Sequence, residues 1–221
     1  MPEEARRVQV RNLGEVSYGE GLKLQDELVA RRRGGEIPDQ LLLLEHPHVI
    51  TRGSSTQEEH LLSAPDELRA RGVEIFDSGR GGDVTYHGPG QLVGYPILDL
   101  KPDRKDLHAY LRDLETVLIR ALATFGIDAG REEGLTGVWV PEGKVAAIGI
   151  RVSSGWITSH GFALNVSTEL SRFSSIVPCG IQDRSVTSMA RILGRPVAVE
   201  DVVPPLVDAF GGVFQREIGV V

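Results

Sequence analysis

The sequence of 221 residues has one cysteine, Cys179, and no long apolar run. A single cysteine forms neither an internal disulfide nor a cysteine zinc cluster, so its thiol serves as a nucleophile or as a packed side chain. Apolar runs such as 41–44 and 145–148 are far shorter than the roughly 20 residues that a membrane-spanning helix needs. The first ten residues hold no apolar signal region. We therefore expect a soluble, cytoplasmic protein that does not bind a membrane.

Positive charge is also scarce. The 24 lysines and arginines stand against 31 acidic residues, which gives a net charge of −7. Such a chain has no overall field that would attract nucleic acid. Its 41% hydrophobic and 25% charged residues are ordinary for a globular protein and argue against disorder. Because no internal repeat or linker is visible, we expect one domain over residues 1–221. We also expect the protein to be a monomer.

Hydrophobic periodicity and turn residues predict a mixed arrangement of helices and strands. Helices are predicted at 17–33, 65–71, 103–125, 186–193 and 199–210, the last made irregular by Pro204 and Pro205. Strands are predicted at 40–45, 73–76, 91–100, 138–140, 144–152 and 157–166. The turn at 141–143 predicts a hairpin. This pattern favours an α/β fold of the α+β type, in which helices pack on a mixed sheet.

The most unusual stretch is the glycine-rich segment 79–90. Arg80, Asp83, Thr85, Tyr86 and His87 alternate there with glycines, which allow the backbone to approach a ligand closely. No Gly-Lys-Ser/Thr follows, and no predicted helix begins there, so a P-loop and a dinucleotide site are both excluded. The segment is either an ordinary hairpin loop or a ligand-binding loop.

Three other features have a structural and a functional interpretation. A lone cysteine is more often a small buried hydrophobe than a nucleophile, but Pro178 and Gly180 indicate a fixed turn around Cys179 whose backbone N–H could face an oxyanion. Lys144 follows a tight turn, where an exposed lysine is the default. His46 and His48 could approach a metal, although a loop at a strand end is the simpler interpretation, and we expect no metal.

Taken together, segments 80–100, 143–152 with 160–166, and 176–181 closely resemble the lipoyl(octanoyl) transferases. The resemblance implies the catalytic-domain fold of biotin and lipoate protein ligases. It also implies a catalytic pair, Cys179 and Lys144. The substrate contacts that it implies are Arg80, Gly81, Gly82, Asp83, Val84, Thr85, Tyr86, His87, Ala147, Ile148, Gly149, Gly161, Phe162 and Ala163.

The implied reaction moves an octanoyl group from octanoyl-acyl-carrier protein to a lysine of a lipoyl domain through an acyl-cysteine thioester. Acceptors would be the glycine-cleavage H protein and the acyltransferase subunits of 2-oxoacid dehydrogenases. Exchange between thioesters keeps the acyl group activated, so we expect no cofactor. Lys144, as an ammonium, would stabilise the Cys179 thiolate. An apolar slot for the acyl chain would use Leu92, Ile148 and Phe162.

Two rival functions stay open at this stage. An ATP-dependent lipoate–protein ligase has the same fold and the same acceptor, but adenylate chemistry has no use for a thiol at position 179. A non-catalytic module that binds lipoyl domains or acyl chains is the second rival. Docking of an acidic carrier protein on a chain of net charge −7 requires a local basic patch, for which Arg80 and the run Arg31, Arg32 and Arg33 are the candidates.

Overall fold

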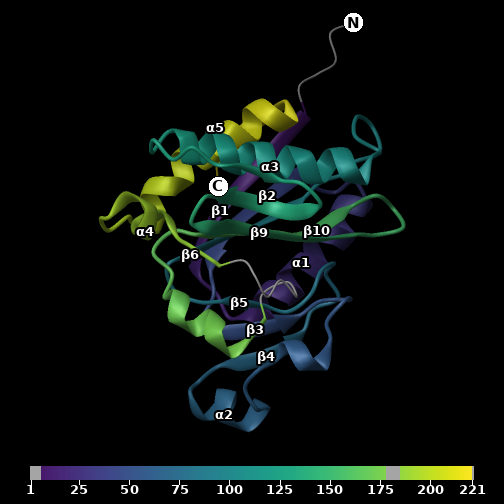
Figure 1. The fold of residues 1–221 in the computed structure, drawn as a ribbon. Coiled ribbons are helices and arrows are strands. Elements are labelled where there is room, and N and C mark those ends of the chain that lie inside the picture. The colour runs from purple at the N-terminus through teal and green to yellow at the C-terminus, as the bar shows by residue number, and fades with distance from the viewer. Residues whose placement is uncertain (1–5, 178–184, 221) are drawn as a thin grey trace, which may run out of the picture.

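The computed structural model describes residues 6–177 and 185–220, which form one large and one small β-sheet. The large sheet has the strand order β11-β1-β2-β6-β10-β9-β8-β7, and the small sheet has the order β4-β3-β5 (Figure 1). The strands of the large sheet are β1 (Arg6–Glu15), β2 (Asp39–Glu45), β6 (Gln91–Ile97), β7 (Gly130–Glu132), β8 (Leu135–Val140), β9 (Gly143–Val152), β10 (Thr158–Asn165) and β11 (Arg216–Val220). Those of the small sheet are β3 (Val49–Arg52), β4 (Glu74–Asp77) and β5 (Thr85–His87).

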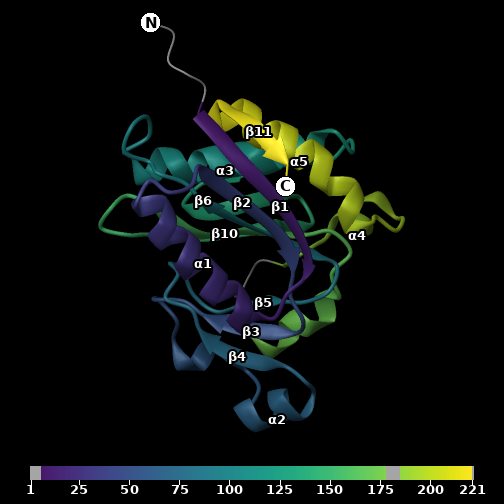
Figure 2. The ribbon, with the colours of Figure 1, turned by 180° about the vertical axis from the view of Figure 1, so that it is seen from behind.

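Helices cover both faces of the large sheet. They are α1 (Tyr18–Arg33), α2 (Pro65–Ala70), α3 (Leu107–Ala123), α4 (Met189–Leu193) and α5 (Val199–Phe214), with short 3₁₀ helices η1 (Glu58–His60) and η2 (Leu170–Ser175). Helices α3 and α5 lie together over one face, whereas α1 lies on the side of the small sheet (Figure 2). No helix within the described residues has the length and apolar character needed to cross a membrane.

Strand β2 shows why the sheet is buried on both sides. Leu41 and Leu43 pack into the core beneath α3 and α5, and Leu42 and Leu44 pack into the core beside α1. Side chains alternate across a strand, so a run of four leucines fits a strand with apolar layers on both faces. The mixed α/β architecture predicted from the sequence is therefore the one observed.

Side-chain caps fix where three of the helices begin. Helix α1 begins directly after Ser17, whose hydroxyl accepts a hydrogen bond from the Glu20 N–H, as predicted. Helix α3 begins later than predicted, because Asp106 is its N-cap. Helix α4 is shorter than predicted, because Ser188 caps it and residue 186 pairs with Lys144 instead.

The last helix is longer than predicted. Helix α5 runs through Pro204 and Pro205 and ends four residues after the predicted boundary. An interior proline costs about 3 kcal/mol or more. The side chains that offset this cost are fully buried, each contributing about 1.5–3 kcal/mol. They are Val202, Leu206, Phe210 and Phe214.

The buried carboxylate of Asp39 links the strands at one edge of the large sheet through ion pairs. Asp39 has no exposed side-chain surface, and its oxygens accept hydrogen bonds from Arg6 at 3.1–3.2 Å, Arg32 at 2.7 Å and Arg216 at 3.0 Å. Asp103 receives further bonds from Arg6 and Arg216. A buried charge is tolerated when several opposite charges and hydrogen bonds surround it. This cluster joins α1, β1, β2 and β11.

Candidate active site

A cavity of about 650 Å³ lies against β9 and β10 and is closed on one side by the glycine-rich segment. Segments far apart in the sequence meet there. Thirteen of the sixteen residues implied by the resemblance line it: Arg80, Gly81, Gly82, Asp83, Thr85, His87, Lys144, Ala147, Ile148, Gly149, Gly161, Phe162 and Ala163. Cys179 lies outside the described residues.

Val84 and Tyr86 are not brought to this cavity. Both side chains pack in the core of the small sheet, and the Tyr86 hydroxyl lies 2.6 Å from Nδ1 of His48. Burial raises the pKa of Tyr86 to about 12. Thr85 and His87, on the alternate positions of β5, line the cavity instead.

Small residues on two neighbouring strands leave room for the cavity. In the antiparallel pairing of β9 with β10, Ala147 lies opposite Ala163, and Gly149 lies opposite Gly161. A Cβ atom at Gly149 would lie 3.0 Å from the Gly81 carbonyl oxygen, and one at Gly161 would collide with the carbonyl oxygen of Gly94. Glycine at position 149 therefore lets the glycine-rich segment lie directly on the sheet, and glycine at position 161 lets β10 lie close to β6.

The apolar part of the lining differs from the prediction at one position. Ile148 and Phe162 line the cavity, as expected, but Leu92 packs in the core beneath α3 and α5. Its neighbour Val93 lines the cavity because successive side chains point to opposite faces. Four further apolar residues that were not predicted also line the cavity: Leu107, Leu111, Leu135 and Ile150.

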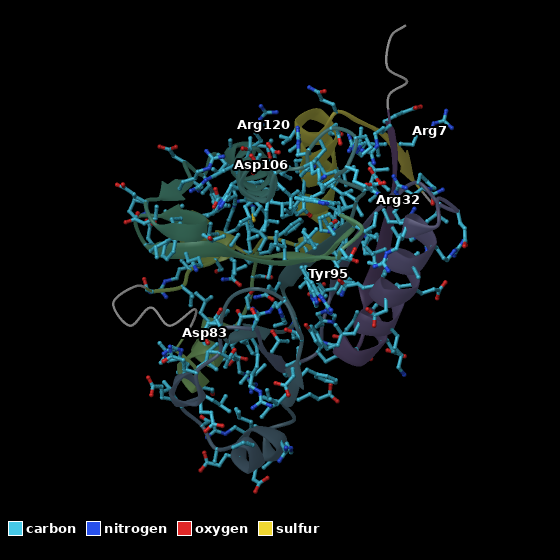
Figure 3. The ribbon with its side chains drawn as sticks, turned by 90° about the vertical axis from the view of Figure 1, so that its right-hand side faces the viewer. Arg7, Arg32, Asp83, Tyr95, Asp106 and Arg120 are labelled. Carbon is cyan, nitrogen blue, oxygen red and sulfur yellow. The ribbon has the colours of Figure 1, made fainter. Side chains whose placement is uncertain are left out.

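Arg80 holds the glycine-rich segment and does not form a docking surface. It is 7% exposed, and its Nη2 donates to the carbonyl and the hydroxyl of Thr51, both at 2.9 Å. In the other candidate patch, Arg31 pairs with Glu27 and Glu36, Arg32 pairs with Asp39, and Arg33 is exposed. Arg32 lies on the opposite side of the molecule from Asp83 (Figure 3). The prediction of a carrier-protein patch at Arg80 therefore does not fit the structure, and the run 31–33 stays a prediction.

Buried histidines supply neutral polar groups near the cavity. Nδ1 of His46 lies 2.6 Å from the Val16 carbonyl and must donate to it, so Nε2 accepts from the Tyr95 hydroxyl at 2.7 Å. Burial lowers the pKa of His46 to about 4 and that of His87 to about 3. Burial and the nearby Arg80 lower the pKa of His160 to about 4. His46 and His48 bond to different tyrosines, so their rings do not converge as a metal pair.

These histidines make the stability of the fold sensitive to acid. The folded chain keeps His46, His87 and His160 neutral, but the unfolded chain protonates them near pH 6.5, so the unfolded state binds more protons below that pH. We expect the free energy of unfolding, measured with urea, to fall by about 3–4 kcal/mol between pH 7 and pH 5.5. Replacing the exposed His108 by glutamine should leave this loss unchanged. Equal free energies of unfolding at the two pH values would contradict the account.

Lys144 is buried, not exposed as a turn lysine would be. It is 6% exposed and lines the cavity, and its Nζ lies 4.7 Å from the centre of the Trp139 ring. An aromatic face stabilises an ammonium group. Its backbone N–H donates to Ser185 and its carbonyl accepts from Thr187, each at 2.9 Å. Position 144 is thus fixed by the chain that follows segment 178–184.

The chain that precedes this segment is fixed on another wall of the cavity. The Val177 N–H donates to the His60 carbonyl at 2.8 Å, and the Leu62 N–H donates to Ser175 at 2.9 Å. His60 itself lines the cavity, as do Tyr18 and Tyr95. None of these three residues belongs to a local motif that would predict a place in the site.

Similarity to known proteins extends over nearly the whole chain. A family model described as the lipoyl protein ligase A/B catalytic domain matches residues 17–211. The octanoyltransferase of Rubrobacter xylanophilus is 53% identical over 212 residues, which cover 95% of each chain.

Solved structures share the fold at low sequence identity. A bi-partite lipoate protein ligase from Thermoplasma acidophilum superposes with a TM-score of 0.76 at 17% identity, covering 99% of this chain and 88% of that one. Biotin protein ligase from Aquifex aeolicus gives 0.54 at 14% identity, covering 94% and 69%. The predicted fold class is confirmed, and the chain belongs to the lipoyl protein ligase A/B catalytic domain family, where it groups with the octanoyltransferases.

Proposed function

We propose that this chain transfers an octanoyl group from octanoyl-acyl-carrier protein to the lysine amine of lipoyl domains. We also propose that the protein is a single catalytic domain, that it is a monomer, and that it is located in the cytoplasm. The observation that carries it is a single cavity that gathers the glycine-rich segment, the buried Lys144 and an apolar wall. Each buried methylene of an acyl chain contributes about 0.8 kcal/mol, so an octanoyl tail would gain several kcal/mol on that wall.

The reaction proceeds in two exchanges at one sulfur. The Cys179 thiolate attacks the carbonyl carbon of the donor thioester, a new C–S bond forms, and the donor sulfur leaves as a thiolate. The neutral lysine amine of the acceptor then attacks the acyl-enzyme, a C–N bond forms as the nitrogen loses one proton, and the Cys179 thiolate leaves. Neither step needs ATP, because the acyl group stays activated until the amide forms.

Lys144 stabilises the sulfur anion in this proposal. An ammonium about 4 Å from a thiolate is worth up to about 4 kcal/mol at an effective dielectric constant near 20. Two observations support this pairing. Lys144 lines the cavity. Cys179 comes two residues after Val177 in the sequence, and two residues of chain span no more than about 7 Å. Val177 is bonded to His60, another lining residue.

The fold alone does not exclude an ATP-dependent ligase, since a lipoate-protein ligase A bound with ATP superposes with a TM-score of 0.77 at 17% identity. The donor separates the two functions. We therefore propose to incubate the chain with a lipoyl domain and either octanoyl-acyl-carrier protein or octanoate with Mg²⁺ and ATP, and to measure the mass of the lipoyl domain.

Octanoylation with the thioester donor alone is the expected result. Octanoylation that requires octanoate and ATP would establish the ligase instead. An unmodified lipoyl domain under both conditions would favour a non-catalytic binding module.

A further inference from the structure

A histidine–carboxylate pair lines the cavity, and the mechanism above does not use it. Nδ1 of His60, in η1, is hydrogen-bonded to Oδ2 of Asp83, in the glycine-rich segment. The side chains are 13% and 10% exposed, and both residues line the cavity. The other oxygen of Asp83 accepts from the Val84 N–H at 2.7 Å, so the carboxylate is held on both sides. Asp83 lies below the large sheet in Figure 3.

This contact decides which nitrogen of His60 is basic. A carboxylate accepts a hydrogen bond, so Nδ1 carries the proton, and the lone pair of the neutral ring lies on Nε2. No described residue forms a hydrogen bond with Nε2. This nitrogen is also absent from the buried polar atoms that lack a partner, so it is not buried. It is therefore open to an incoming group. An imidazole oriented by a carboxylate, with its second nitrogen free, is the arrangement of a general base.

The other histidines of the cavity are less suited to this task. His87 is buried and bonded through Nδ1 to Gln91 at 2.7 Å. His160 is buried near Arg80, whose positive charge disfavours a second cation. His60, by contrast, is hydrogen-bonded directly to the Asp83 carboxylate.

We propose that His60, oriented by Asp83, accepts the proton that the acceptor lysine loses when the amide forms. This inference rests on the proposed octanoyl transfer. The deprotonated amine nitrogen bonds to the acyl carbon, the C–S bond breaks with its electron pair leaving on sulfur, and one N–H proton passes to Nε2 of His60. The imidazolium, paired with Asp83, later releases that proton to water. Lys144 as an ammonium has no lone pair for this step, so the two residues have complementary roles.

The test separates the two exchanges. The chain is first loaded with octanoyl from the carrier-protein thioester, and transfer to an excess of lipoyl domain is then followed in a single turnover. We expect His60→Gln to be acylated at the wild-type rate, within about twofold, but to aminolyse about 10²–10³-fold more slowly. Asp83→Asn should slow aminolysis by about 10-fold. The matched control, His108→Gln, should match the wild type in both exchanges.

Chemical rescue distinguishes a base from a structural residue. In His60→Ala, added imidazole should raise the rate of aminolysis in proportion to its concentration. In Lys144→Met, added imidazole should leave the rate of aminolysis unchanged. Aminolysis at the wild-type rate in His60→Gln would overturn the proposal. So would an equal loss in both exchanges without rescue by imidazole, which would give His60 a structural role. Failure of the wild type to load octanoyl at all would overturn the proposed function and this inference with it.

Discussion

Replacing Cys179 by serine is expected to reduce octanoyl transfer by about 10⁴-fold or more. A cysteine is partly ionised at neutral pH and is intrinsically very nucleophilic, but a serine hydroxyl stays protonated and needs a strong base. Removing the nucleophile of an enzyme that forms a covalent intermediate costs several powers of ten in rate. The measurement is the steady-state rate of lipoyl-domain octanoylation with the carrier-protein thioester as donor.

A matched control lies a few residues away. Ser174 in η2 is exposed, and Ser174→Ala should transfer octanoyl at the wild-type rate. Both variants should keep the circular dichroism spectrum of the wild type, since each changes few atoms. A Cys179→Ser protein with more than about 1% of wild-type activity would be inconsistent with a covalent role for sulfur.

Replacing Lys144 by methionine is expected to lower the transfer rate at pH 7 by about 10²–10³-fold. Methionine keeps a long, unbranched side chain against Trp139 but removes the positive charge. A cation about 4 Å away can lower the pKa of a thiol by up to about three units, so its loss leaves the thiol mostly protonated at neutral pH. Lys144→Arg keeps the charge and should lose less activity.

The alkylation rate of the single cysteine tests this effect directly. In Lys144→Met, the pH midpoint of alkylation by iodoacetamide should move upward by one to three units, whereas Lys101→Met, at an exposed position before α3, should keep the wild-type midpoint. The same midpoint in Lys144→Met and the wild type would reject the pairing of this lysine with the thiol.

Elements with strong local signals could be predicted from the sequence. Helix α1 has a serine cap and a glycine after its last turn, and β2 is a short run of leucines. Strands β1 and β11 were missed for a physical reason. In β1, charged residues flank Val8 and Val10, and one of its two parallel partners, β11, lies at the other end of the chain, with Arg6 opposite Arg216. Pairing between distant segments leaves no local pattern to detect.

The sequence predicted those residues of the site that belong to recognisable motifs. The glycine-rich segment and the small residues of β9 and β10 meet at one cavity, whereas His60, Tyr18 and Tyr95 reach it only through the folding of distant segments. Alternation along a strand would have separated Thr85 and His87 from Tyr86. The docking prediction for Arg80 failed because sequence does not reveal burial. The carbonyl and hydroxyl of Thr51 engage that guanidinium inside the protein.

The central claim is that the acyl group rests on the single thiol between the two exchanges. The most direct test is the intact mass of the protein after mixing with octanoyl-acyl-carrier protein in the absence of a lipoyl domain. We predict a gain of one octanoyl group that neutral hydroxylamine removes and that prior alkylation of Cys179 prevents. An adduct that still forms on the alkylated protein, or no adduct while transfer to a lipoyl domain proceeds, would contradict the account.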